Sequence, residues 1–178
     1  MRAARSLLSR IVLVVLAASA CARMSAHAQV DLYSLEAAYI FNFTQFTEWP
    51  AAPAAGTVLT VCVNPRTPLG AMLAKLDGRA VAGKTWSVKP MSEGTAVTAC
   101  DVLIVDDATS NAATKASPTS DLPILVVRTA DADASDGHYV VTLFREGDRL
   151  RFDIDNTEAV RRHLGLSSKL LRLARNVT

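Results

Sequence analysis

The chain has 178 residues, of which 50% are hydrophobic and 20% are charged, and its formal net charge is +2 at pH 7. Four of its 19 basic residues but none of its 17 acidic residues lie within positions 1–28, so the rest of the chain has 15 basic residues and a net charge of −2. This balance excludes a strongly basic nucleic-acid-binding protein.

Residues 1–28 have the three parts of a secretory signal peptide. Three arginines precede an apolar run over 11–20, which is too short to span a bilayer, and Ala26-His27-Ala28 supplies the small residues of a cleavage site. We expect cleavage after Ala28 and a periplasmic domain over residues 29–178. The alternative is a lipoprotein attached through Cys21, which follows Ala18-Ser19-Ala20.

The segment LEAAYIFNFTQFTEWP, residues 35–50, predicts an aromatic amphipathic helix that Pro50 ends. Its expected apolar stripe consists of Leu35, Ala38, Tyr39, Phe43, Phe46 and Trp49. Asn42 falls inside this stripe, so we expect it to be buried with its amide bonded to nearby backbone. Phe41 projects from the polar face. It either packs under another segment or belongs to an apolar patch that docks on a partner.

Four apolar runs predict buried strands, over residues 57–64, 85–90, 101–107 and 121–130. A helix that Pro68 begins and Gly78 ends lies between the first two. Because these runs are continuously apolar and not alternating, they predict a largely parallel sheet with both faces covered by helices. The expected fold is a single α/β domain.

The chain ends differently, with a β-hairpin over residues 138–155 that turns at Glu146-Gly147-Asp148. Two short helices follow, the first capped by Asn156 and ended by Gly165, the second capped by Ser167. They hold five basic residues with no acid beyond Glu158, namely Arg161, Arg162, Lys169, Arg172 and Arg175. These cations form either a solvated helix surface or a docking patch for an acidic partner or anionic lipid.

Three motifs that suggest chemistry have simpler interpretations. GRAVAGKT, residues 78–85, fits the phosphate-loop formula, but a helix precedes it and an extended segment follows, the reverse of the required order. DADASDG, residues 131–137, lacks the glycine and glutamate positions of a calcium loop. Asp106-Asp107 follows a strand without a matching group elsewhere, and we interpret it as solvated.

No catalytic constellation, metal site or cofactor is expected. Beyond residue 28 the chain has two histidines, His138 and His163, no G-x-S-x-G elbow and no spacing typical of zinc ligands. We therefore expect a protein that is not an enzyme.

Two cysteines, Cys62 and Cys100, remain after the signal peptide. In an oxidising compartment an even pair predicts a disulfide, and the alternative is two buried thiols. A ring of about 39 residues would stabilise the fold by about 4 kcal/mol in the chain-entropy model. Simple parallel pairing would offset the two, because Cys62 lies late in its strand and Cys100 just before another.

Two stretches together resemble the YfiR-like periplasmic proteins: residues 35–50 and the C-terminal REGDRLRFDIDNTEAVRRHLGLSSKLLRLARNV. The segments VLTVCVN and ACDVLIVDD lie between them in the expected order, and the resemblance spans residues 32–177. It implies a secreted regulator that binds the periplasmic part of an inner-membrane diguanylate cyclase and inhibits it, which lowers cyclic di-GMP and biofilm formation.

The resemblance also implies a redox-sensitive Cys62–Cys100 bridge, although a second cysteine pair of the best-known member is missing here. A membrane sensor kinase is the alternative partner, with this protein as a small-ligand-binding accessory, and a homodimer stays open. The residues expected to contact the partner are Phe41, Trp49, Arg161, Arg162, Lys169 and Arg172.

Overall fold

The computed structural model describes residues 32–50, 56–91, 97–110, 121–133 and 137–178. The expected signal peptide, its cleavage site and Cys21 lie outside these ranges. Within them, no helix has the length and the apolar character needed to cross a membrane.

Seven strands form one mixed sheet in the order β3-β4-β2-β5-β6-β7-β8. The five central strands, β4, β2, β5, β6 and β7, are parallel to one another, and the edge strands β3 and β8 pair antiparallel with β4 and β7. The strands are β2 (Val58–Val63), β3 (Ala80–Val81), β4 (Lys84–Pro90), β5 (Val102–Val105), β6 (Leu125–Arg128), β7 (Val141–Glu146) and β8 (Arg149–Ile154). The fold is therefore the expected single α/β domain with a largely parallel sheet.

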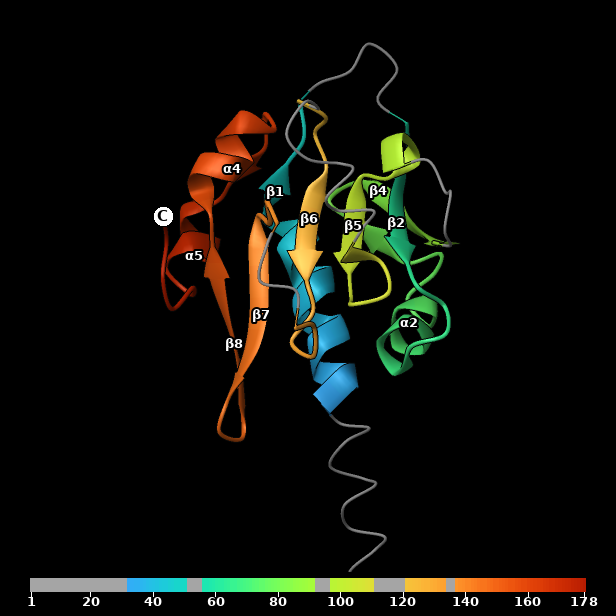
Figure 1. Cartoon of the computed structure of the whole chain (residues 1–178). Coiled ribbons are helices and arrows are strands. Elements are labelled where there is room, and N and C mark those ends of the chain that lie inside the picture. Colours follow the sequence, from blue (N-terminus) through green and yellow to red (C-terminus); the bar gives the residue numbers. More distant parts are fainter. Residues whose placement is uncertain (1–31, 51–55, 92–96, 111–120, 134–136) are drawn as a thin grey trace, which may run out of the picture.

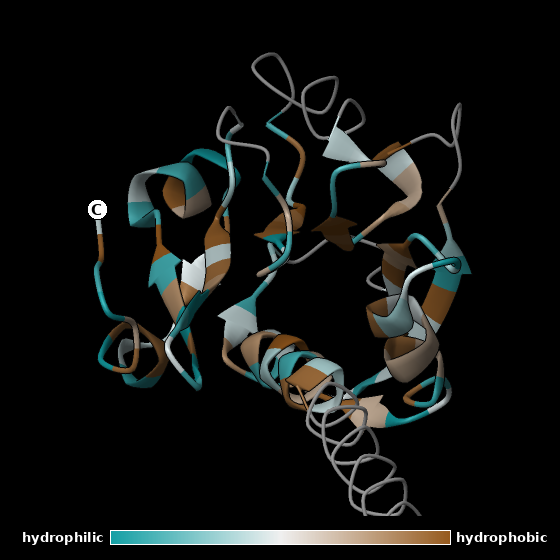
Figure 2. Ribbon diagram, turned by 60° about the horizontal axis from the view of Figure 1, so that its bottom comes forward, coloured by the Kyte–Doolittle hydropathy of each residue, from teal (hydrophilic) through white to brown (hydrophobic). Residues whose placement is uncertain are grey.

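The sheet is curled, and the N-terminal helix, residues 32–45, lies on its concave side (Figure 2). In Figure 1 this helix is the blue coil behind β6 and β7. The other described helices are α2 (Pro68–Ala74), α4 (Asn156–Arg161), α5 (Ser168–Leu171) and the 3₁₀ turn η1 (Val97–Ala99). Helices α4 and α5 stand together on the flank next to the edge strand β8 (Figure 1).

Both faces of the central strands are buried. Successive side chains of a strand point to opposite sides of the sheet, so one strand contributes to two core clusters. In β5, Val102 and Ile104 belong to the larger core cluster, whereas Leu103 and Val105 belong to a smaller one. The larger cluster holds residues from the N-terminal helix, α2, α4 and α5. The smaller cluster includes both cysteines and packs against Val97 of η1. Helical cover is thus uneven between the faces in the described residues.

The predicted aromatic helix is correct in position but wrong in its end and in its buried face. It ends at residue 45, and the short strand β1 (Thr47–Glu48) follows and pairs with β9 (Gly165–Leu166). Leu35 is exposed, as is Asn42, whose side-chain oxygen accepts a hydrogen bond from Gln45 at 3.3 Å. The expected burial of Asn42 is therefore wrong.

The physical reason is that polar residues occupy the buried side of this helix. Glu36 and Thr44 are buried beside Ile40 and Phe43, and both polar groups have backbone partners. Glu36 accepts a hydrogen bond from the Ala130 amide, and the Thr44 hydroxyl donates to a backbone carbonyl of the preceding turn. Neither residue belongs to the expected apolar stripe, so the predicted buried face is rotated around the helix axis relative to the observed one.

The C-terminal hairpin has its predicted turn, with Gly147 in the left-handed region at a φ of 59°. The first helix cap is a correction: Asp155, and not Asn156, accepts the hydrogen bond from the Glu158 amide. This helix ends at Arg161, and Gly165 belongs to β9. Ser167 caps α5 as expected, through the Leu170 amide.

The segment GRAVAGKT forms a tight hairpin between β3 and β4. Its two central residues, Ala82 and Gly83, have φ values of 48° and 77°, as a two-residue hairpin turn requires. An antiparallel strand pair cannot aim a helix N-terminus at phosphate, so the interpretation of this motif as a chance match is supported.

Candidate functional site

The Cys62–Cys100 disulfide is present, with the Cα atoms 5.8 Å apart. Cys62 is in register with Leu103 of β5, so the bridge is not formed by simple strand pairing. Cys100 instead follows η1, a turn that packs over the smaller core cluster. The turn brings Cys100 next to Cys62 although the two cysteines are not paired in the strand register. Both cysteines are buried.

Of the aromatic residues expected to bind a partner, Phe41 is partly buried. Its ring centroid lies 5.2 Å from that of Trp86 and 5.6 Å from the Arg79 guanidinium carbon. Trp49 is also partly buried, with the Lys84 ammonium 5.8 Å from its ring. Both side chains therefore contact the β3–β4 region, and packing accounts for much of their surface.

Arg162 was expected on the docking surface, but it is 0% exposed and lies beneath it. Its Nε donates to Glu158 Oε1 at 2.6 Å, and Arg161 binds the same carboxylate through two nitrogens. Burial by itself raises the pKa of Glu158, but the hydrogen bonds from the two arginines outweigh burial and hold that pKa below its ordinary value. Arg162 thus belongs to a buried ion-pair network within α4 and its C-terminal cap.

Lys169 and Arg172 are exposed as expected, whereas Arg175 pairs with Asp153 across 2.5 Å. Two large apolar side chains are exposed in this C-terminal region, Val160 in α4 at 63% and Leu173 just after α5 at 67%. We call Val160, Lys169, Arg172 and Leu173 the C-terminal surface. The sequence analysis identified the two cations of this surface but not its two apolar residues. In a helix of only one or two turns, the spacing of apolar residues is too short to separate exposed from buried positions.

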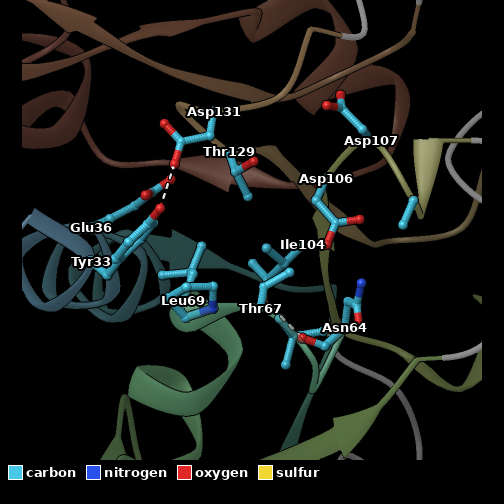
Figure 3. A pocket seen from close by; sticks show the side chains of 13 residues that line it. Tyr33, Glu36, Asn64, Thr67, Leu69, Ile104, Asp106, Asp107, Thr129 and Asp131 are labelled. Atoms are coloured by element: carbon cyan, nitrogen blue, oxygen red, sulfur yellow. Dashed lines mark hydrogen bonds between the residues drawn. The ribbon is translucent and has the colours of Figure 1, made fainter. Parts of the chain in front are cut away.

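A cavity of about 330 Å³ opens at the carboxyl ends of the parallel strands β2, β5 and β6. We call it the carboxyl-edge cavity (Figure 3). Open parallel sheets commonly bind ligands at this edge. Its walls come from the N-terminal helix, the turn that precedes α2 and the loops after the three strands. Asp106 and Asp107 belong to this lining, so they were correctly assigned to a strand end but not recognised as part of a cavity.

The turn that precedes α2 is held close to the strand end by a local network. The Thr67 hydroxyl caps α2 by accepting from the Gly70 amide and donates to the Asn64 carbonyl at 3.0 Å. A Cβ at Gly70 would collide with that carbonyl, so this position requires glycine. This packing places Asn64, Thr67 and Leu69 along one wall of the carboxyl-edge cavity (Figure 3).

The opposite wall is acidic. Tyr33 and Glu36 project from the N-terminal helix toward Asp131, which accepts a hydrogen bond from the Tyr33 hydroxyl at 2.9 Å (Figure 3). Asp131 also pairs with Arg145 at 2.6 Å. The carboxylate of Asp106 accepts from Thr109 in its own loop. No group of acidic, histidine or cysteine side chains in the described ranges has the geometry of a metal site.

Glu36 is the most buried carboxyl in this wall, with 1% of its surface exposed. Its pKa is raised from 4.5 to about 7, mainly by burial and also by the charge of Asp131, whereas the hydrogen bond from the Ala130 amide and the charge of Arg145 lower it. Nothing in the sequence singled Glu36 out, because it lies between apolar residues on a helix predicted to be one-sided.

The fold thus defines a small α/β domain with a disulfide, a C-terminal surface and a cavity at the sheet edge. The model of the YfiR/HmsC-like family matches residues 33–175. The chain belongs to this family. No curated protein matches the sequence. The family is regulatory and non-enzymatic, and membership fits a regulator of diguanylate cyclases in general.

Proposed function

We propose that this protein is a periplasmic regulator that binds the periplasmic part of an inner-membrane diguanylate cyclase and inhibits the cyclase. Inhibition would lower cyclic di-GMP and biofilm formation. The observation that carries the proposal is the family match over residues 33–175. The N-terminal features of a signal peptide and the buried disulfide support an extracytoplasmic site of action.

The C-terminal surface is the docking site in this proposal. It combines two exposed apolar side chains, Val160 and Leu173, with the cations Lys169 and Arg172. Exposed apolar groups supply binding free energy when they are covered, and surrounding charges set the choice of partner. Arg161 stands at its margin, partly exposed and bound to Glu158, and Phe41 and Trp49 would contribute only their exposed edges.

Deletion of the gene should raise cyclic di-GMP and biofilm in the source bacterium, and affinity capture from membranes should recover a diguanylate cyclase. Unchanged cyclic di-GMP together with recovery of no cyclase would contradict the proposal.

A double variant, Lys169→Glu with Arg172→Glu, tests the docking site. Both side chains are exposed, so the variant should fold while its binding to the cyclase weakens at least tenfold. The matched control is Arg66→Glu with Lys89→Glu, which reverses two exposed cations located elsewhere. Equal binding by the two double variants would place the contact outside the C-terminal surface.

The second candidate is an accessory protein that binds a small ligand for a membrane sensor kinase. The carboxyl-edge cavity favours this candidate, because its volume lies within the range of small-molecule sites. Capture of a histidine kinase in place of a cyclase would decide for it.

A further inference from the structure

The carboxyl-edge cavity has a charge that selects among ligands. Among the described residues that line it, four are acidic and none is Lys, Arg or His. The acidic residues are Glu36, Asp106, Asp107 and Asp131. The nearest cation in the contacts of this wall, Arg145, is bound to Asp131. Phosphates and carboxylates would meet repulsion here, whereas a cation would be attracted.

Glu36 distinguishes this cavity from a set of surface carboxylates. Its Oε1 accepts the Ala130 amide at 2.9 Å, and within the described part of the chain its Oε2 receives no hydrogen bond. Its side chain lines the cavity and is almost entirely removed from water. An almost fully buried carboxyl with a single hydrogen-bond donor is costly to ionise, so a cationic donor that enters the cavity would be bound favourably.

The rest of the lining describes the body of the ligand. Val63, Leu69 and Ile104 give the cavity an apolar wall, and they belong to the core cluster, which keeps them in fixed positions. The hydroxyl groups of Thr67 and Thr129 lie near that wall (Figure 3). A ligand that fits these surfaces has an apolar portion next to its charged group.

We propose that the carboxyl-edge cavity binds a small organic amine, with the ammonium group at Glu36 and the apolar body against Leu69 and Ile104. This inference does not depend on the proposed inhibition of a cyclase, because the cavity and the C-terminal surface share no residue, and it names the ligand class that the second candidate function would require.

Isothermal titration calorimetry on the chain without residues 1–28 tests the inference with two probes of matched shape. Cyclohexylamine carries a positive charge and cyclohexanecarboxylate a negative one on the same ring. The amine should bind with a stoichiometry of one, and the carboxylate should show no heat of binding. Equal binding of the two probes, or binding of neither, would overturn the proposal.

Variants then locate the site. Glu36→Gln keeps the side-chain shape and should weaken amine binding about tenfold or more, because it removes a charged acceptor. Asp148→Asn removes a carboxylate at the exposed hairpin turn, outside the cavity, and should leave amine binding unchanged. Ala108→Trp, at an exposed position of the lining, should abolish binding by filling the cavity. Full affinity in both cavity variants would overturn the assignment.

The pH dependence adds an independent readout. Glu36 faces Tyr33 and Asp131, and Asp131 is paired with Arg145. Burial is the main cause that raises the pKa of Glu36 to about 7. Its ionised fraction rises about tenfold between pH 6 and pH 8 for a pKa of about 7. Amine affinity should rise by a similar factor in the wild type and stay flat in Glu36→Gln. The same rise in both would contradict the role of Glu36.

Discussion

Replacement of Glu36 by Gln should stabilise the folded protein at pH 8 while leaving its stability at pH 4 almost unchanged. The Glu36 carboxyl is buried, and its pKa is raised from 4.5 to about 7 in the folded state. A glutamine keeps the side-chain oxygen that accepts the Ala130 amide. The substitution therefore removes the ionisation and retains the hydrogen bond.

The direction follows from proton linkage. Between pH 4.5 and about 7 the folded state holds a proton on Glu36 that the unfolded state has released, so stability falls as the pH rises through this window. The contribution is fully present below pH 4.5 and fully lost above about pH 7. With about 1.4 kcal/mol per pH unit, the wild type loses about 3 kcal/mol from this group. The variant avoids that loss.

Urea denaturation at pH 4, 6 and 8 measures the effect as the difference in unfolding free energy between variant and wild type. That difference should be near zero at pH 4 and approach about 3 kcal/mol at pH 8, equivalent to a melting temperature higher by about 6 to 12 °C. The Asp148→Asn control should show no such trend. A difference that stays constant across the three pH values would refute the reasoning, because it would assign the effect to packing.

Three further predictions concern stability. The double variant Cys62→Ser with Cys100→Ser should lose about 4 kcal/mol in urea denaturation, and a loss below about 1 kcal/mol would indicate that the bridge constrains the unfolded chain little. Arg162→Ala should cost about 3 kcal/mol by the same measurement, because it leaves a cavity and removes one of the two arginines bound to the buried Glu158; a near-neutral effect would show that the second arginine suffices. Asn42→Ala should change the free energy of unfolding by no more than about 0.5 kcal/mol, since the side chain is exposed. A clearly lower melting temperature would show that Asn42 is buried after all.

Local patterns were sufficient for the strands and their turns. The run VLIV in β5 is buried at all four positions, which is what a continuous apolar run predicts for a parallel strand covered on both faces. The β7–β8 hairpin followed from alternation around Gly147, because the two-residue side-chain period and the turn geometry are both local properties. The expected parallel pairing of the central strands is confirmed, whereas their order in the sheet was not predicted and is set by long-range pairing.

The N-terminal helix was harder because its buried face depends on segments far away in the chain. Glu36 is buried by Ala130, which is 94 residues distant, and this contact overrides the polarity of the side chain. Asn42 is exposed for the complementary reason, since the buried residues Glu36, Ile40 and Thr44 lie on another side of the helix. Arg162 was misplaced in the same way, because its burial depends on an ion pair within α4 and on the core beneath that helix.

The amino-acid sequence by itself determined the α/β class, the parallel strands, the terminal hairpin and the pair of cysteines, because these depend on periodicity, turn chemistry and counting. The family resemblance also came from sequence and agrees with the match over residues 33–175. The tertiary structure alone decided which side chains gather at the carboxyl-edge cavity and which form the C-terminal surface. Those groupings join loops and helices from distant positions, and a buried polar residue such as Glu36 is stable only where long-range packing supplies its partner.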